Sequence, residues 1–196
     1  MLLHLHSITP HSTVNGPGRR TVLHTQGCSL GCKGCFNPLT HTFEGGTPWT
    51  VDALVEHVQQ LGDEGITWSG GEPTEQMEVV LAMSHRLKKL GFSQVMFSGR
   101  TKAEIETLPG GVELLHQLDV LIDGRYQAEL GLRRGLRGSA NQNVHLLSDR
   151  YPAEALEPPD KPSSVEVLIA PDGTVMMSGF PTPQLARSVR KALGQA

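Results

Sequence analysis

Residues 21–35 read TVLHTQGCSLGCKGC, and this stretch decides the expected fold. Residues 21–25 form a β-branched, apolar run that predicts a strand. The loop that follows holds Cys28, Cys32 and Cys35, and the rest of the chain has no cysteine. Because an odd number of cysteines cannot all pair internally, three thiols in one short loop favour metal binding over disulfides.

Downstream of this loop, strand-like and helix-like segments alternate, which is the pattern of a parallel α/β fold. Further strands are predicted at 66–69, 94–98, 119–122 and 143–147. Amphipathic helices are predicted at 51–61, where Thr50 can act as the N-cap, and at 77–90.

The composition changes after residue 150. A Pro-rich stretch comes first, and then two strand-like runs flank a Pro-Asp-Gly turn and precede a helix start at Pro183. We therefore predict a core domain at 1–150, a Pro-rich linker at 151–164, and a β-hairpin and helix appendage at 165–196 that packs on the core. We expect the hairpin to cap the exposed edge strand of the sheet.

Length and charge exclude several classes of protein. The chain has 196 residues, fewer than the roughly 250 of a complete (β/α)8 barrel. Its 17 Lys and Arg against 20 Asp and Glu give a net charge of −3, which argues against a nucleic-acid partner. No apolar run approaches the roughly 20 residues of a membrane span, and no basic region precedes the first apolar residues. We expect a cytoplasmic protein with no membrane partner.

Two kinds of metal centre suit the cysteine loop. Three thiolates at short intervals can hold a [4Fe–4S] cluster in which Cys28, Cys32 and Cys35 each bind one iron and the fourth iron stays open to a substrate. The alternative is a structural zinc site completed by His24 or His41.

A second motif, SGGEP at 69–73, follows a predicted strand, where parallel sheets bind their ligands. Gly70 and Gly71 allow a ligand to approach the backbone, and Glu72 can accept hydrogen bonds from an ammonium group. The alternative is an ordinary Gly-Gly turn with a solvated glutamate.

These motifs resemble the radical S-adenosylmethionine superfamily, whose signature is C-x3-C-x2-C. The form CKGCFN at 32–37 is similar to the activating proteins of anaerobic ribonucleotide reductase, which are glycyl-radical enzyme activases. The resemblance extends to VNGPG at 14–18, DVLIDG at 119–124 and RGSANQ at 137–142. The chain departs from the commonest signature at Gly34, where an aromatic residue usually precedes the last cysteine.

The resemblance implies an incomplete (β/α)6-type barrel and a set of cofactor-binding residues. The SGGEP segment, with Gly70, Gly71 and Glu72, would bind the amino group of S-adenosylmethionine. Ser98 would replace a threonine of the family, although Arg100 stands where the family has tyrosine. Asp123, at the end of the fourth strand, is a further candidate, with a structural role as the alternative. Asn141, in a polar cluster, is another, with an ordinary hydrogen-bonded loop as the alternative.

The resemblance also implies a function. Members reductively cleave S-adenosylmethionine at a [4Fe–4S] cluster to a 5′-deoxyadenosyl radical, which takes a hydrogen atom from a glycine of a partner. That partner is a glycyl-radical enzyme, here anaerobic ribonucleotide reductase, and a flavodoxin- or ferredoxin-like protein would donate the electron.

Two other functions stay open. One is a radical enzyme acting on a small molecule, such as a deazaguanine-forming synthase, against which the short chain counts. The other is a non-catalytic iron–sulfur or zinc module, against which SGGEP and the long α/β core count.

Overall fold

The computed structural model describes residues 1–156, 164–169, 173, 175–181 and 183–192. Most of the predicted Pro-rich linker and the Pro171-Asp172 part of the predicted turn lie outside these residues.

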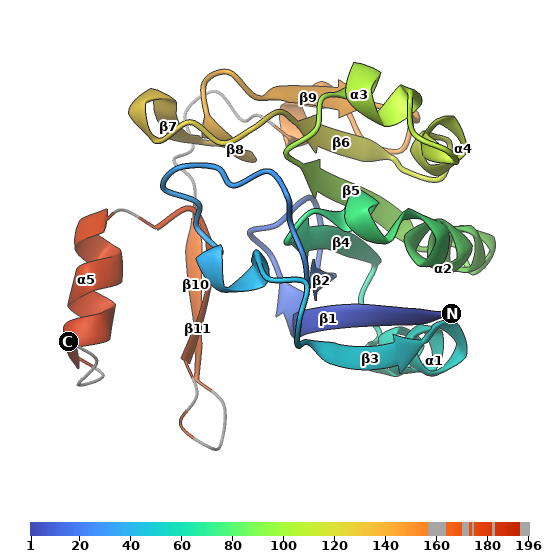
Figure 1. The fold of residues 1–196 in the computed structure, drawn as a ribbon, viewed down its shortest axis with the longest axis horizontal. Helices are drawn as coiled ribbons and strands as arrows, with labels where there is room; N and C mark the ends of the chain where they lie inside the picture. Colours follow the sequence, from blue (N-terminus) through green and yellow to red (C-terminus); the bar gives the residue numbers. More distant parts are fainter. Residues whose placement is uncertain (157–163, 170–172, 174, 182, 193–196) are drawn as a thin grey trace.

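A seven-stranded sheet forms the body of the molecule, in the order β3-β1-β2-β4-β5-β6-β9 (Figure 1). Its strands are β1 (Leu2–Ser12), β2 (Arg20–Thr25), β3 (Thr47–Thr50), β4 (Gly65–Gly70), β5 (Ser93–Ser98), β6 (Val120–Asp123) and β9 (Asn143–Leu146). Neighbours among β2, β4, β5 and β6 are parallel, whereas β1, β3 and β9 pair antiparallel. The predicted α/β class is therefore confirmed, with a mixed sheet instead of a parallel one.

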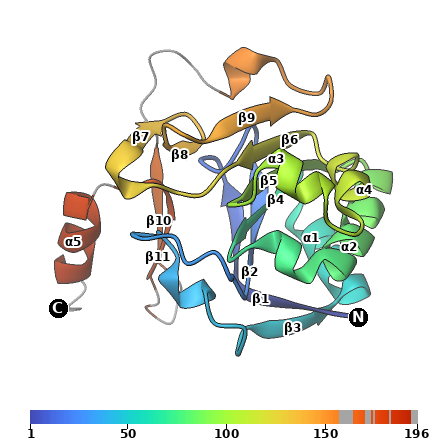
Figure 2. The same ribbon diagram turned by 45° about the horizontal axis from the view of Figure 1, so that its top comes forward.

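Four helices lie together on one side of this sheet (Figures 1 and 2). They are α1 (Val51–Leu61), α2 (Met77–Lys89), α3 (Lys102–Glu106) and α4 (Gly111–Leu115). Thr50 begins α1 as predicted, because its side chain accepts a hydrogen bond from the Ala53 N–H at 3.2 Å. None of the described helices has the length and apolar character needed to cross a bilayer.

Strand alternation divides the buried side chains between the two faces of the sheet. In β5, Met96 joins the main core beneath the helices, whereas Val95 and Phe97 belong to a second cluster on the opposite face. In β6, Leu121 and Ile122 divide in the same way. The second face therefore stays free of the four helices and is available to the loops at the strand ends.

A buried arginine fastens the start of the parallel strands. Arg20 is fully buried, and its guanidinium donates to Thr67 Oγ1 at 2.9 Å, Ser93 Oγ at 2.7 Å and the Ile66 carbonyl at 2.5 Å. Burial lowers its pKa. Tyr151 also reaches Ser93 through its hydroxyl at 2.7 Å, and Leu156 is buried in the second cluster. The first residues of the predicted linker therefore pack on the core.

Asp63 joins three segments near the same end of the sheet. Its carboxylate accepts hydrogen bonds from the His11 N–H at 3.1 Å, Arg19 Nε at 2.8 Å and Thr21 Oγ1 at 2.7 Å. Burial acts to raise the Asp63 pKa, but the hydrogen bonds from His11 and Thr21 outweigh it and hold the pKa below its usual 3.8. The charged carboxylate thus stabilises the fold.

We expect Asp63→Asn to lower the free energy of unfolding at pH 7 by about 1–2 kcal/mol, because one acceptor becomes a donor. A lowered folded pKa gives stability that is present above the unfolded pKa and is lost as pH falls through the folded value. Urea unfolding should therefore show the difference from wild type at pH 7 and a smaller one below pH 3.8. Asp149→Asn, at an exposed carboxylate, is the control, and equal effects of both variants would contradict this role.

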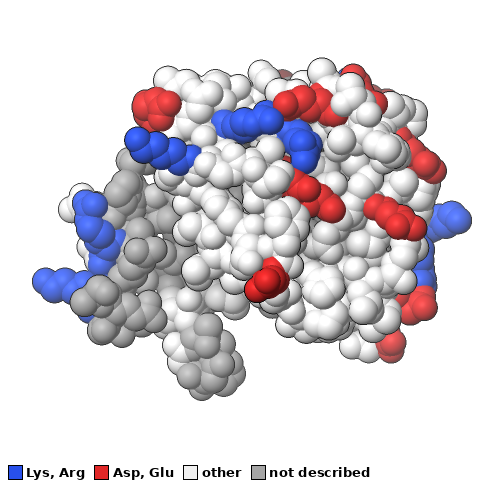
Figure 3. All heavy atoms as spheres, in the orientation of Figure 1, with Lys and Arg blue, Asp and Glu red and all other residues white. Residues whose placement is uncertain are grey.

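The charged groups on the face shown in Figure 3 are dispersed. Asp and Glu side chains are scattered over the helical side, and Lys and Arg side chains at the left edge lie over the C-terminal helix α5 (Pro183–Ala192). No field of a single sign covers the described part of this face.

The C-terminal hairpin consists of β10 (Val165–Ile169) and β11 (Val175–Gly179), paired antiparallel. Across the described residues these strands form a two-stranded sheet of their own, as β7 (Gly131–Arg134) and β8 (Arg137–Ser139) also do. The expectation that the hairpin caps the edge of the main sheet is therefore wrong. Both views place it beside the loops at the carboxyl ends of the parallel strands, where its own side chains find contacts (Figures 1 and 2).

Candidate functional site

A cavity of ≈ 320 Å³ opens at the carboxyl ends of the parallel strands. Its lining includes all three cysteines and the residues at the ends of β4 and β5: Cys28, Cys32, Cys35, Gly70, Gly71, Glu72, Ser98 and Gly99. The volume is within the range of about 300–1,000 Å³ that is typical of small-molecule sites. The structure thus brings together the two motifs singled out in the sequence.

Glycines shape the cysteine loop. Each cysteine directly follows a glycine with positive φ, a conformation that other residues rarely adopt: Gly27 at +96°, Gly31 at +58° and Gly34 at +77°. These conformations let the short loop curl so that all three cysteines line one cavity.

Backbone hydrogen bonds anchor this loop to its neighbours. The Cys28 N–H donates to the His41 carbonyl at 3.2 Å, and the Glu72 N–H donates to the Gly27 carbonyl at 2.9 Å. A Cβ at Gly71 would lie only 2.3 Å from the Gly27 carbonyl oxygen, so this approach requires glycine. The cysteine loop and the SGGEP loop therefore form one unit.

The sulfur atoms suit an iron–sulfur cluster. The three cysteines are free thiols, and the Asn37 N–H donates to Cys35 Sγ at 3.3 Å. Burial raises the pKa of the Cys28 and Cys35 thiols, although backbone N–H groups of Leu30 and Asn37 act in the opposite direction. Such N–H donors stabilise thiolates, as cluster ligands require. The donor set and the space beside it fit a [4Fe–4S] cluster.

The zinc alternative would need a histidine as its fourth ligand. His24 and His41 both line the cavity with the three cysteines, but His24 already has a hydroxyl partner. His24 Nε2 lies 3.1 Å from Thr9 Oγ1, and burial lowers the His24 pKa to about 4.

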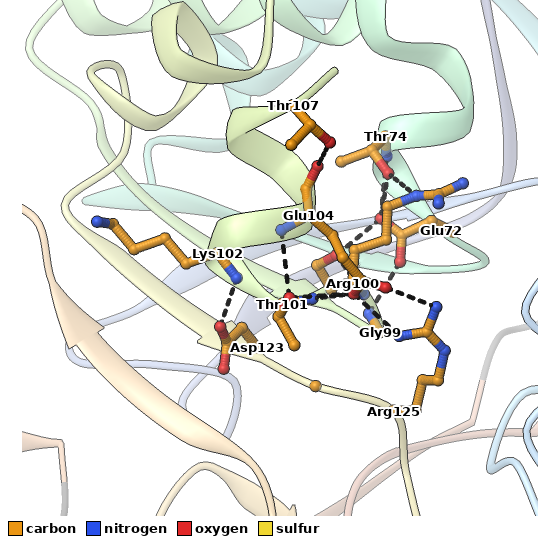
Figure 4. Close-up of polar contacts among 12 residues, drawn as sticks. Glu72, Thr74, Gly99, Arg100, Thr101, Lys102, Glu104, Thr107, Asp123 and Arg125 are labelled. Carbon is orange, nitrogen blue, oxygen red and sulfur yellow. Dashed lines mark hydrogen bonds and ion pairs between the residues drawn. The ribbon is translucent and has the colours of Figure 1, made fainter.

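Glu72 is the most deeply buried carboxylate of the cavity, with 1% of its surface exposed. Its Oε1 accepts from the Thr74 N–H at 3.2 Å, Thr74 Oγ1 at 2.7 Å and Ser98 Oγ at 2.9 Å. Its Oε2 accepts only from the Gly99 N–H, at 2.8 Å, among the described residues (Figure 4). Burial raises the Glu72 pKa against the effect of these bonds. Since a carboxylate has about four acceptor sites, capacity for a further donor remains at Oε2.

Arg100 makes structural contacts with two neighbouring side chains. Its Nε donates to Thr74 Oγ1 at 3.0 Å and its Nη2 pairs with Glu75 at 2.8 Å. The same Glu75 oxygen accepts from Ser29 Oγ at 2.5 Å, next to Cys28. The departure from the expected tyrosine thus ties the end of β5 to the cysteine loop.

The other two predicted residues lie outside the cavity lining. Asp123 accepts from the Lys102 N–H at 2.6 Å (Figure 4). It also accepts from Asn143 Nδ2 at 3.0 Å, so its carboxylate joins β6 to α3 and β9. Asn141 donates to the Arg125 carbonyl at 2.8 Å. The backbone neighbour Gly124 lines the cavity instead.

Sequence reasoning missed an aromatic wall. Phe36 lies 4.7 Å from Tyr126 and 5.5 Å from Phe180, measured between ring centroids, and Phe97 lies 6.4 Å from Phe180. Phe36 and Phe97 adjoin predicted site residues, which was a usable signal. No sequence motif pointed to Phe180, because it belongs to the appendage. Asn15 of VNGPG also lines the cavity.

Comparisons with known proteins agree with this geometry. The family described as a 4Fe-4S single cluster domain matches residues 14–145. An anaerobic ribonucleoside-triphosphate reductase-activating protein of Vibrio cholerae is 34% identical over 155 residues, which cover 73% of this chain and 97% of that protein. The protein of the same description from Enterobacteria phage T4 is 33% identical over 149 residues, covering 72% of this chain and 93% of its own.

Two further similarities cover a smaller part of the chain. A pyruvate formate-lyase-activating enzyme of Staphylococcus epidermidis is 40% identical over 95 residues, covering 45% of this chain and 38% of that enzyme. The crystal structure of QueE from Escherichia coli gives a TM-score of 0.44 at 19% identity, over 52% of this chain and 54% of that one, which is too low to bear on function. From the family match and the near full-length relatives, the chain belongs to the anaerobic ribonucleoside-triphosphate reductase-activating proteins, radical S-adenosylmethionine enzymes that carry a [4Fe–4S] cluster.

Proposed function

We propose that this protein generates a glycyl radical on a partner enzyme, anaerobic ribonucleotide reductase, by reductive cleavage of S-adenosylmethionine. The observation that carries the proposal is the gathering of three cysteines, Glu72 and Ser98 around one cavity. The similarity, which covers nearly the whole length of the activating proteins, supports the choice of partner.

Cys28, Cys32 and Cys35 would hold the cluster, one cysteine to each of three irons. When bound, the [4Fe–4S] cluster supplies the electron that cleaves the cofactor to a 5′-deoxyadenosyl radical. The chain itself would bind and orient the cofactor.

Glu72 would receive the ammonium group of the cofactor at Oε2, where its acceptor capacity remains. Gly70 and Gly71 would let the same group approach the backbone, and Ser98 would orient the carboxylate through Oε1. Asp123 and Asn141 would act from outside the cavity, by fixing the loops after β6.

We infer that the mixed sheet is an incomplete (β/α)6-type barrel, with residues 1–150 as the core domain, 151–164 as a linker and 165–196 as an appendage. The parallel strands β2, β4, β5 and β6 with their crossovers support this inference. A sheet that leaves one side open gives a large protein access to the cavity, whereas a small-molecule enzyme needs an enclosed one. An electron donor of the flavodoxin or ferredoxin type and a cytoplasmic location complete the proposal.

The test is a reaction under anaerobic conditions with the cluster-loaded protein, its ribonucleotide reductase, S-adenosylmethionine and a reductant. We expect a glycyl-radical doublet in electron paramagnetic resonance, and no such signal when the target glycine of the partner is replaced by alanine. Turnover of a small molecule with no partner present would instead favour a deazaguanine-synthase-like enzyme.

A further inference from the structure

We propose that strand β11 and Phe180 complete the reaction cavity, and that this wall couples cleavage of S-adenosylmethionine to hydrogen abstraction from the partner's glycine. The proposal rests on the proposed function. It assigns a role to the appendage. The appendage lies beyond the matched family region, which ends at residue 145, before β10 begins.

The position of β11 is the first observation that supports the proposal. Five consecutive residues, 177–181, line the same cavity as the three cysteines. Elements distant in sequence thus share one site, with the cysteine loop and SGGEP on one side and the appendage on another. The hairpin is part of the cavity rather than a support at the sheet edge.

Phe180 is held at a defined place in this wall. Its ring contacts Phe36, which follows Cys35, and Phe97, which precedes Ser98. A Cβ at Gly138 would lie only 2.8 Å from Phe180 Cε1, so a glycine in β8 leaves the space that the ring fills. The ring thus spans from the cysteine loop to the end of β5.

Two polar contacts fix the hairpin against the loop before β2. Asn15 Nδ2 donates to Ser178 Oγ at 2.5 Å, and both residues are buried. Glu166 Oε1 accepts from the Thr13 N–H at 2.7 Å and from Thr13 Oγ1 at 2.9 Å. The hairpin is therefore attached on both of its strands.

This arrangement has a chemical consequence. A reactive carbon radical is quenched by reductant and by hydrogen donors from solution, so an aromatic side chain that covers the cavity protects it until the partner's glycine takes its place there. Loss of that cover should waste cofactor. The wasted fraction is measured by the amount of 5′-deoxyadenosine formed per glycyl radical.

The test compares Phe180→Ala with Ile169→Ala, which removes an exposed side chain from the same hairpin. We expect Phe180→Ala to raise the amount of 5′-deoxyadenosine formed per glycyl radical by about two- to tenfold. This is the size of effect expected when an aromatic ring contact that holds the cavity covered is lost. Ile169→Ala should match wild type. A purely structural role would lower both products together and leave their ratio unchanged, which would overturn the proposal.

A second measurement needs no partner and no turnover. When the anaerobic, cluster-loaded chain meets an iron chelator, its visible absorption should fade faster in Phe180→Ala than in wild type or Ile169→Ala. Equal rates in all three proteins would overturn the proposal. This measurement also separates the two hypotheses, because it is independent of whether wild type cleaves the cofactor.

Gly138→Ala keeps the proposal testable if Phe180→Ala fails to fold. The added methyl group displaces the Phe180 ring without removing it, so both readouts should move in the same direction as in Phe180→Ala. If glycyl radicals formed faster while the amount of 5′-deoxyadenosine per glycyl radical stayed unchanged, Phe180 would only obstruct access to the cavity. That result would overturn the coupling role.

Discussion

We expect replacement of Cys28, Cys32 or Cys35 by alanine to abolish cofactor cleavage, because each cysteine would bind a different iron and none can replace another. The cluster should be lost or degraded in all three variants, which reduces the brown visible absorption after anaerobic reconstitution with iron and sulfide. Production of 5′-deoxyadenosine under reduction should fall to background.

Lys33→Ala is the matched control, since Lys33 is exposed in the same loop. It should retain both absorption and cleavage, which shows that the loop tolerates change at positions without a thiol. A colourless wild-type protein that holds one stoichiometric zinc after anaerobic purification would contradict the cluster assignment.

Glu72→Gln should weaken binding of S-adenosylmethionine about ten- to a hundredfold, because a charge-assisted hydrogen bond contributes about 1.5–3 kcal/mol. The amide oxygen can still accept from the Gly99 N–H, and the hydroxyls of Thr74 and Ser98 can rotate to accept from the amide. The variant therefore keeps most of the local network and loses the negative charge. Glu72→Ala would remove every one of these contacts and disturb folding as well.

Calorimetric titration of the cluster-loaded protein with the cofactor measures this effect. Glu78→Gln, at an exposed position in the first turn of α2, serves as the control and should bind like wild type. An unchanged dissociation constant in Glu72→Gln would remove Glu72 from the binding site.

Periodicity predicted the elements that are long or strongly patterned. The helical spacing behind Thr50 located α1, and β-branched runs located β2 and β4. The five-residue helices α3 and α4 are too short to show a period. Strand β1 alternates Leu3 and Leu5 inward with exposed histidines, a signal that went unused, and no periodicity gives the direction in which β9 pairs.

For the site, strand ends were a reliable guide to position but not to side-chain direction. The rule that ligands meet the carboxyl ends of parallel strands correctly joined the cysteine loop to SGGEP. The same rule selected Asp123, whose side chain follows Leu121 to the helix-covered face of β6. The contribution of Phe180 depends on tertiary packing alone.

The hairpin also comes after every other part of the site in the chain. Crossovers between neighbouring parallel strands let the sheet grow in chain order, so the cysteine loop, SGGEP and the end of β5 can assemble during synthesis before β11 exists. Until β11 docks, the thiols face an unfinished side of the cavity. The thiols of the cysteine loop are therefore synthesised well before the residues that close the remaining side of their cavity.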